Sequence, residues 1–189
     1  MHRTLILASA SPQRRKLLRS LGVPFRVCPA RISETCADAQ PSRVAAELAL
    51  RKARAVAARH PRSIVLGADT IVVCRGSVLV KPVSRADNAR MLDSLNGRWH
   101  RVVTGVALVD ASSGRVWREV VVSRVKARRL KPEELALFVG KHMDKAGGYA
   151  VQDRKDPFIE RVVGPFDNVV GLPLSAVRRL LRAACHRRA

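Results

Sequence analysis

The segment Ser63–Cys74, SIVLGADTIVVC, constrains the fold more than any other part of the sequence. It is almost continuously apolar and rich in β-branched residues, which is typical of a strand buried on both faces. Arg75–Gly76 follows directly and predicts a hairpin turn. The segment is therefore expected to form a kinked central strand or a pair of buried strands.

Predicted strands and helices alternate along the rest of the chain, with hairpins between some strands. A Ser-Pro pair marks one helix start, since Ser11 suits an N-cap and Pro12 the first helical position. This pattern indicates an α/β fold with a mixed sheet rather than a purely parallel one. The 189 residues suffice for one domain or two closely packed lobes. Strands are expected at 4–8, 25–28, 63–74, 78–80, 102–109, 116–127 and 158–164, and longer helices at 12–21, 42–60 and 84–95.

Two charged residues stand in apolar surroundings. Asp69 interrupts the buried strand, and a carboxylate there is costly unless it is paired, bound to a metal or functional. Such a group suits a general base or a Mg²⁺ ligand, although a turn cap at a strand end is the plainer alternative. Lys52 falls in the middle of the apolar arc of the second helix, where lysine is seldom buried without a partner. Lys52 is expected to have either a function or a buried partner.

The segment LASASPQRR offers a phosphate site at the start of the first helix. A helix N-terminus presents unpaired N–H groups and a partial positive charge, to which phosphate binds readily. Ser9 and Ser11 add hydroxyl groups, and Arg14 can grip a phosphate with two donors. An ordinary capped helix with surface arginines explains the same pattern.

Three further features carry weaker signals. Lys81 precedes Pro82, which stiffens the backbone, and its charge suits either phosphate binding or solvent. The loop DKAGGYAVQ contains two glycines that let backbone approach a ligand, but it matches no phosphate-loop motif. Its last residue, Gln152, has an amide that can read a base edge or simply face solvent.

The charge of +21, from 36 Lys and Arg against 15 Asp and Glu, points to an anionic partner. Nucleic acid is one candidate, supported by the basic C-terminal run RRLLRAACHRRA. Aromatic residues make up only 4% of the chain, however, so a base-stacking surface is not expected. An enzyme for anionic nucleotides would need only a few of these cations, and we favour that interpretation.

Several classes of protein do not fit. The four cysteines have no metal-ligand spacing, and the nucleophile-elbow pattern GxSxG of serine hydrolases is absent. No apolar run approaches the length of a membrane span, and the N-terminal apolar stretch is too short for a signal peptide. A cytoplasmic protein without a membrane partner is therefore expected.

Six ordered blocks resemble the Maf family of nucleotide pyrophosphatases over nearly the whole length, so residues 1–189 are expected to form a single Maf-like domain. The blocks are LILASASPQRRKLL, LALRKARAVA, LGADTIVV, KPVSRADNARMLDSLNGRWHRVVTGVAL, DKAGGYAVQ and NVVGLPL. The resemblance implies a mixed sheet in a two-lobed α/β fold with a central cleft, similar to the inosine triphosphate pyrophosphatases. It also implies hydrolysis of a nucleoside triphosphate between its α- and β-phosphates with a divalent cation, Mg²⁺ or Mn²⁺.

The resemblance also assigns roles to residues. Asp69 matches the family's proton acceptor, and Glu34 matches a loop glutamate that would join Asp69 in holding the metal. Thr70 and Gln152 match the subfamily similar to dTTP/UTP pyrophosphatases, whereas Gln13 stands where that subfamily has arginine. The remaining matches are substrate-binding residues: Ser9, Ser11, Arg14, Lys52 and Lys81.

Two alternatives remain beside a dTTP/UTP pyrophosphatase. One is a nucleic acid-binding protein, which would bind duplex DNA in a salt-sensitive way without needing Asp69. The other is a catalytically idle relative that binds nucleotide as a regulator. A homodimer is expected by analogy with the family.

Overall fold

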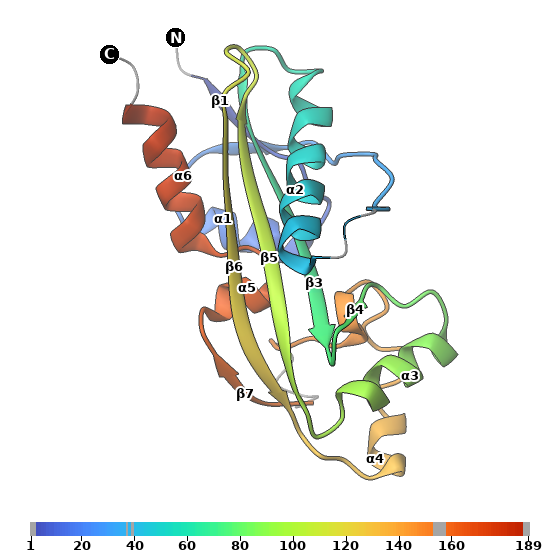
Figure 1. The fold of residues 1–189 in the computed structure, drawn as a ribbon. Coiled ribbons are helices and arrows are strands. Elements are labelled where there is room, and N and C mark those ends of the chain that lie inside the picture. Colours follow the sequence, from blue (N-terminus) through green and yellow to red (C-terminus); the bar gives the residue numbers. More distant parts are fainter. Residues whose placement is uncertain (1–2, 37, 39, 153–157, 187–189) are drawn as a thin grey trace. The chain divides into compact units, whose positions relative to one another are not determined.

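The computed structural model describes residues 3–36, 38, 40–152 and 158–186. Within them a mixed sheet is combined with helices (Figure 1). The elements, in chain order, are β1 (Thr4–Leu7), α1 (Pro12–Arg19), β2 (Phe25–Val27), α2 (Pro41–Ala57), β3 (Ser63–Cys74), β4 (Ser77–Leu79), α3 (Arg85–Leu95), β5 (Trp99–Asp110), β6 (Val116–Ala127), α4 (Pro132–Ala136), the 3₁₀ helix η1 (Ala146–Gly148), β7 (Ile159–Val163), α5 (Phe166–Val170) and α6 (Leu174–His186).

The strands form one sheet in the order β2-β1-β3-β5-β6-β7, with β4 paired to β3. β1 is parallel to both β2 and β3, whereas β4 and β7 run antiparallel to their neighbours. The sheet is therefore mixed, as the alternation of elements predicted. None of the helices in the described residues is long and apolar enough to cross a membrane.

The apolar segment 63–74 forms one continuous strand, β3, rather than two. The turn at Arg75–Gly76 leads into β4 as predicted, and both turn residues have positive φ angles. The second helix begins one residue earlier and ends three residues earlier than expected, at Pro41 and Ala57. The strand expected at 102–109 is longer, because β5 extends to Trp99 and Asp110.

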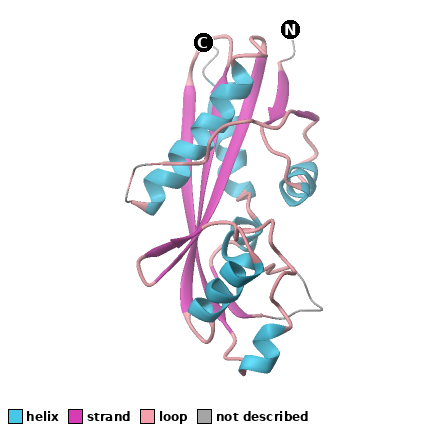
Figure 2. Cartoon of the chain, turned by 90° about the vertical axis from the view of Figure 1, so that its right-hand side faces the viewer, coloured by secondary structure: helices cyan, strands magenta, loops and turns pink. Residues whose placement is uncertain are grey.

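The chain packs into two compact units, and the first contains residues 1–69, 104–121 and 171–189. In this unit helices cover both faces of the sheet (Figure 2). Leu5 and Leu7 of β1 pack in one core cluster with residues of α1 and α6, while Ile6 and Ala8 pack in another with residues of α2. The alternation follows from the two-residue period of a strand, and it makes β1 apolar from Leu5 onward.

Two glycines let α2 lie unusually close to the sheet of the first unit. A Cβ atom on Gly67 of β3 would lie 2.2 Å from the carbonyl oxygen of Ala49, and one on Gly105 of β5 would lie 2.2 Å from that of Ala45. Only a residue without a side chain fits at either position. Asp69 follows Gly67 by two residues and so faces the same side of the sheet as α2.

The second unit contains residues 70–103 and 122–170. Its core gathers apolar residues from the second halves of β3 and β6 around Tyr149 and Phe158. The ring of His100 is buried in this unit, and its Nε2 lies 2.7 Å from the hydroxyl oxygen of Tyr149. Burial lowers the pKa of His100 to about 4, so this histidine is a neutral core residue at pH 7.

Gly67→Ala is expected to lower the free energy of unfolding by about 2 kcal/mol or more, because the added methyl group meets helix backbone that cannot move aside. Chemical denaturation measures the change. Gly22→Ala is the matched control, since a Cβ there meets nothing within 4 Å and costs only the strain of a positive φ. A Gly67→Ala variant as stable as the wild type would show that α2 is not held at this distance.

The buried His100 predicts a loss of stability in acid. Its pKa of about 4 in the folded state lies below the value of about 6.5 in an unfolded chain, so the stabilisation is complete above pH 6.5 and disappears as the pH falls toward 4. The loss is about 3 kcal/mol over this window. The free energy of unfolding should be measured against pH for the wild type and for His100→Gln, whose side chain takes up no proton. The two plots should differ in slope between pH 6.5 and 4. Parallel curves would contradict the prediction.

Candidate active site

The first helix begins with the cap that the sequence predicted. Ser11 is the N-cap residue of α1, and its hydroxyl oxygen accepts a hydrogen bond from the Arg14 backbone N–H at 3.4 Å. Pro12 occupies the first helical position, and the first turn contains no acidic residue. The buried Ser9 accepts a second hydrogen bond, from the Ser11 backbone N–H at 3.2 Å. This helix end therefore has the positive character that suits an anion.

The Arg14 side chain is held in place by two oxygens of the first unit. Its Nε donates to the carbonyl oxygen of Gly171 at 2.9 Å, and its Nη1 donates to Ser9 Oγ at 3.4 Å. Burial lowers the pKa of Arg14, while Asp69 and Glu34 oppose that shift with their negative charges. Because an arginine stays protonated even so, the structure places a fixed cation at the helix start.

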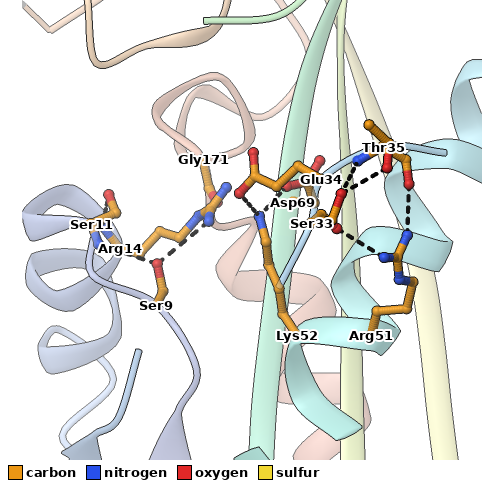
Figure 3. Close-up of polar contacts among 10 residues, drawn as sticks. All are labelled: Ser9, Ser11, Arg14, Ser33, Glu34, Thr35, Arg51, Lys52, Asp69 and Gly171. Atoms are coloured by element: carbon orange, nitrogen blue, oxygen red, sulfur yellow. Dashed lines mark hydrogen bonds and ion pairs between the residues drawn. The ribbon is translucent and has the colours of Figure 1, made fainter. Parts of the chain in front are cut away.

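Lys52 joins two carboxylates, one deep and one near the surface (Figure 3). Its Nζ lies 2.5 Å from Asp69 Oδ1 and 2.7 Å from Glu34 Oε1. The side chains of Lys52 and Asp69 are 10% and 8% exposed, whereas that of Glu34 is 50% exposed. The expected partner of Lys52 is therefore present, and Asp69 is not a turn cap but one half of a buried ion pair.

The loop that carries Glu34 is fixed by a residue that the sequence did not single out. Arg51 donates from Nη2 to the carbonyl oxygen of Ser33 and from Nη1 to that of Thr35, both at 2.8 Å (Figure 3). The hydroxyl oxygens of Ser33 and Thr35 also lie 2.7 Å apart. Side-chain contacts to backbone carbonyls leave no pattern in a sequence, which is why Arg51 did not stand out there.

The two carboxylates also bear on metal binding. Within the described ranges, no group of three or more His, Cys, Asp or Glu side chains is arranged to hold a metal ion. Asp69 and Glu34 nevertheless each place one carboxylate oxygen within 2.7 Å of the same atom, Lys52 Nζ. Mg²⁺ is commonly held by one or two carboxylates together with substrate phosphates, so this donor set fits a nucleotide-bound divalent cation.

The other predicted site residues have less defined surroundings. Gln13 lies half-buried on α1 beside Arg14, and Thr70 follows Asp69 on β3. Lys81 and Gln152 are exposed residues of the second unit. A hydrogen bond from the Gly147 N–H to the carbonyl oxygen of Val80, at 3.1 Å, ties the glycine loop to the segment that carries Lys81. The roles of these four side chains stay predictions.

Comparison with known proteins gives a consistent result. The profile of a family described as Maf-like protein matches residues 4–184. A dTTP/UTP pyrophosphatase of Elusimicrobium minutum is 45% identical over 178 residues, which cover 94% of this chain and 97% of the relative. A protein of the same name from Moorella thermoacetica is 48% identical over 180 residues, covering 94% of this chain and 93% of the relative.

A solved structure supports the fold. The Ham1 protein of Staphylococcus aureus aligns over 96% of this chain and 100% of its own, with a TM-score of 0.54 and 13% sequence identity. At that identity the likeness concerns the fold alone. It agrees with the expected α/β architecture with a mixed sheet.

The ion pair predicts an asymmetry between its two partners. Lys52→Met should lower the free energy of unfolding by about 3 kcal/mol, because it leaves the Asp69 charge buried without the cation that contacts it. Asp69→Asn should cost less, since Lys52 keeps its contact with Glu34. The double variant should lose about 1 kcal/mol less free energy of unfolding than the two single variants lose together. Urea denaturation of the four proteins measures this coupling, and strictly additive losses would argue against the pair.

Proposed function

Because the chain belongs to the Maf-like protein family, we propose that it hydrolyses dTTP and UTP to the nucleoside monophosphate and pyrophosphate. The observation that carries the proposal is the buried carboxylate of Asp69, held at 2.5 Å by Lys52 and accompanied by Glu34 and Arg14. A buried acid with paired cations beside it suits a reaction in which a water must lose a proton near phosphate. The proposal keeps the cytoplasmic location expected from the sequence.

The chain's own cations bind the triphosphate in this proposal. Backbone N–H groups at the start of α1 and the hydroxyl groups of Ser9 and Ser11 donate to phosphate oxygens. The guanidinium group of Arg14 is already oriented by its hydrogen bond to Gly171, so little side-chain entropy is lost when it binds phosphate. Lys52 and Lys81 add positive charge that stabilises the negative charge growing on the phosphates during displacement.

Glu34 and Asp69 are the residues that would hold a divalent cation, Mg²⁺ or Mn²⁺, together with the nucleotide. When bound, such an ion neutralises phosphate charge and favours loss of a proton from water. The half-exposed Glu34 can be reached from solvent, whereas the buried Asp69 is held by Lys52 of α2.

Asp69 is proposed as the general base. Its carboxylate accepts a proton from a water molecule whose oxygen attacks the α-phosphorus. The bond from that phosphorus to the bridging oxygen then breaks, and pyrophosphate leaves with the bond electrons. Lys52 orients Asp69, since its Nζ lies 2.5 Å from one oxygen of the buried carboxylate.

The base preference rests on three residues. Thr70 and Gln152 match the pattern of the dTTP/UTP pyrophosphatases, and both can exchange hydrogen bonds with a pyrimidine. Gln13 replaces the arginine of that pattern and so removes one charge and a planar pair of donors beside Arg14. We therefore propose a preference for dTTP and UTP with weaker binding of the triphosphate than an arginine would give.

Purified protein with Mg²⁺ should release pyrophosphate faster from dTTP and UTP than from ATP, GTP or CTP. Asp69→Asn should lower kcat by about 100-fold or more, because the variant cannot accept the proton. Circular dichroism would establish that Asp69→Asn is folded. Asp93→Asn, which neutralises an exposed carboxylate on α3, is the matched control and should keep wild-type turnover.

The other outcomes are also informative. Chelation of divalent cations with EDTA should stop the release of pyrophosphate, and Gln13→Arg should lower KM for dTTP. Turnover that survives in Asp69→Asn would refute the proposed base. If pyrophosphate were released from ATP and GTP as fast as from dTTP and UTP, the roles of Thr70 and Gln152 would be refuted, but the proposed reaction would stand.

A further inference from the structure

Glu34 is the part of the site whose position needs an explanation. It lies in an irregular segment between β2 and α2, and its side chain is half exposed. An ion pair open to solvent contributes little to stability and is weakened further by salt. The contact with Lys52, at 2.7 Å, is of this kind and by itself contributes little to the order of the loop.

Arg51 constrains the backbone on both sides of Glu34. Its two terminal nitrogens each donate to a carbonyl oxygen at 2.8 Å, one on the residue before Glu34 and one on the residue after it. The backbone on both sides of Glu34 is thus fixed to the same helix, α2, that carries Lys52. Consecutive residues of a helix point about 100° apart, so Arg51 can hold the loop backbone while Lys52 reaches the Glu34 carboxylate.

We propose that Arg51 is a positioning residue for the reaction, acting through Glu34. The inference rests on the proposed function, in which Glu34 and Asp69 hold the divalent cation together. By fixing residues 33–35, Arg51 keeps the Glu34 carboxylate beside Lys52 and Asp69 before any ligand arrives. The cation then binds without first having to order the loop, which favours tighter binding.

The geometry requires arginine in particular. A guanidinium group has a planar fork of donors that can serve two carbonyl oxygens at once, whereas a lysine ammonium group is a single compact centre. Arg51→Lys should therefore retain part of the effect, and Arg51→Ala should lose it. Arg54→Ala is the matched control, because Arg54 is an exposed arginine one turn further along α2.

Three measurements test the proposal. Titration calorimetry with Mn²⁺ alone should show about tenfold weaker binding in Arg51→Ala, with Arg51→Lys in between and Arg54→Ala unchanged. Pyrophosphate release from dTTP at saturating Mn²⁺ should fall about tenfold or more in kcat, since a small displacement of a catalytic group is costly. Thermal midpoints should stay close to that of the wild type, because the contacts of Arg51 lie at the surface.

A double-mutant cycle separates positioning from a general effect on structure. In a Glu34→Gln background the metal-binding carboxylate is already lost, so adding Arg51→Ala should change Mn²⁺ affinity and kcat by less than twofold. If Arg51→Ala has the same effect in both backgrounds, or none in the wild-type background, the inference is overturned. A wild-type protein that releases no pyrophosphate would instead refute the proposed function, while Mn²⁺ affinity would still test the role of Arg51.

Discussion

A charged carboxylate inside an apolar strand is the constraint on which this site depends. Asp69 is almost fully buried, and a lone charge at that depth would be strongly destabilising. Lys52 offsets the cost because it lies equally deep, at 2.5 Å. This pairing requires a helix to pass close to the strand, and it requires that the helix present a lysine among its alanines and leucines. The chemistry of the site and the packing of the first unit therefore depend on the same close contact between α2 and β3.

The absence of side chains at two positions makes this close contact possible. Gly67 and Gly105, on neighbouring strands, let the backbone of α2 rest on the sheet, so the lysine needs to span only a short gap. Arg14 lies on another helix of the same unit, α1, where it is fixed by a backbone oxygen near the start of α6. A strand and two helices therefore place Asp69, Lys52 and Arg14, whereas Glu34 lies in an irregular segment whose backbone Arg51 ties to α2.

How much of this was predictable depends on what each residue costs the chain. Asp69 and Lys52 stand out in the sequence because polar groups in apolar surroundings need partners, and the structure confirms that they pair with each other. The Ser11 cap was predictable from local helix chemistry and is confirmed. Glu34 came only from the family resemblance, since a glutamate in a polar loop has no energetic signature. Arg51 was missed because its partners are backbone carbonyls, and one arginine resembles any other in a chain with 36 Lys and Arg.

The composition of the first unit has a consequence for how the protein is made. That unit is assembled from three separated stretches, and the oxygen that orients Arg14 belongs to Gly171, 157 residues further along the chain. During synthesis the arginine is therefore produced long before its acceptor, and an incomplete polypeptide cannot form this contact. Folding must wait for these distant stretches to meet, and such nonlocal contacts make it slow. The oriented cation at the start of α1 should accordingly form late and all at once, rather than build up as the ribosome moves along the message.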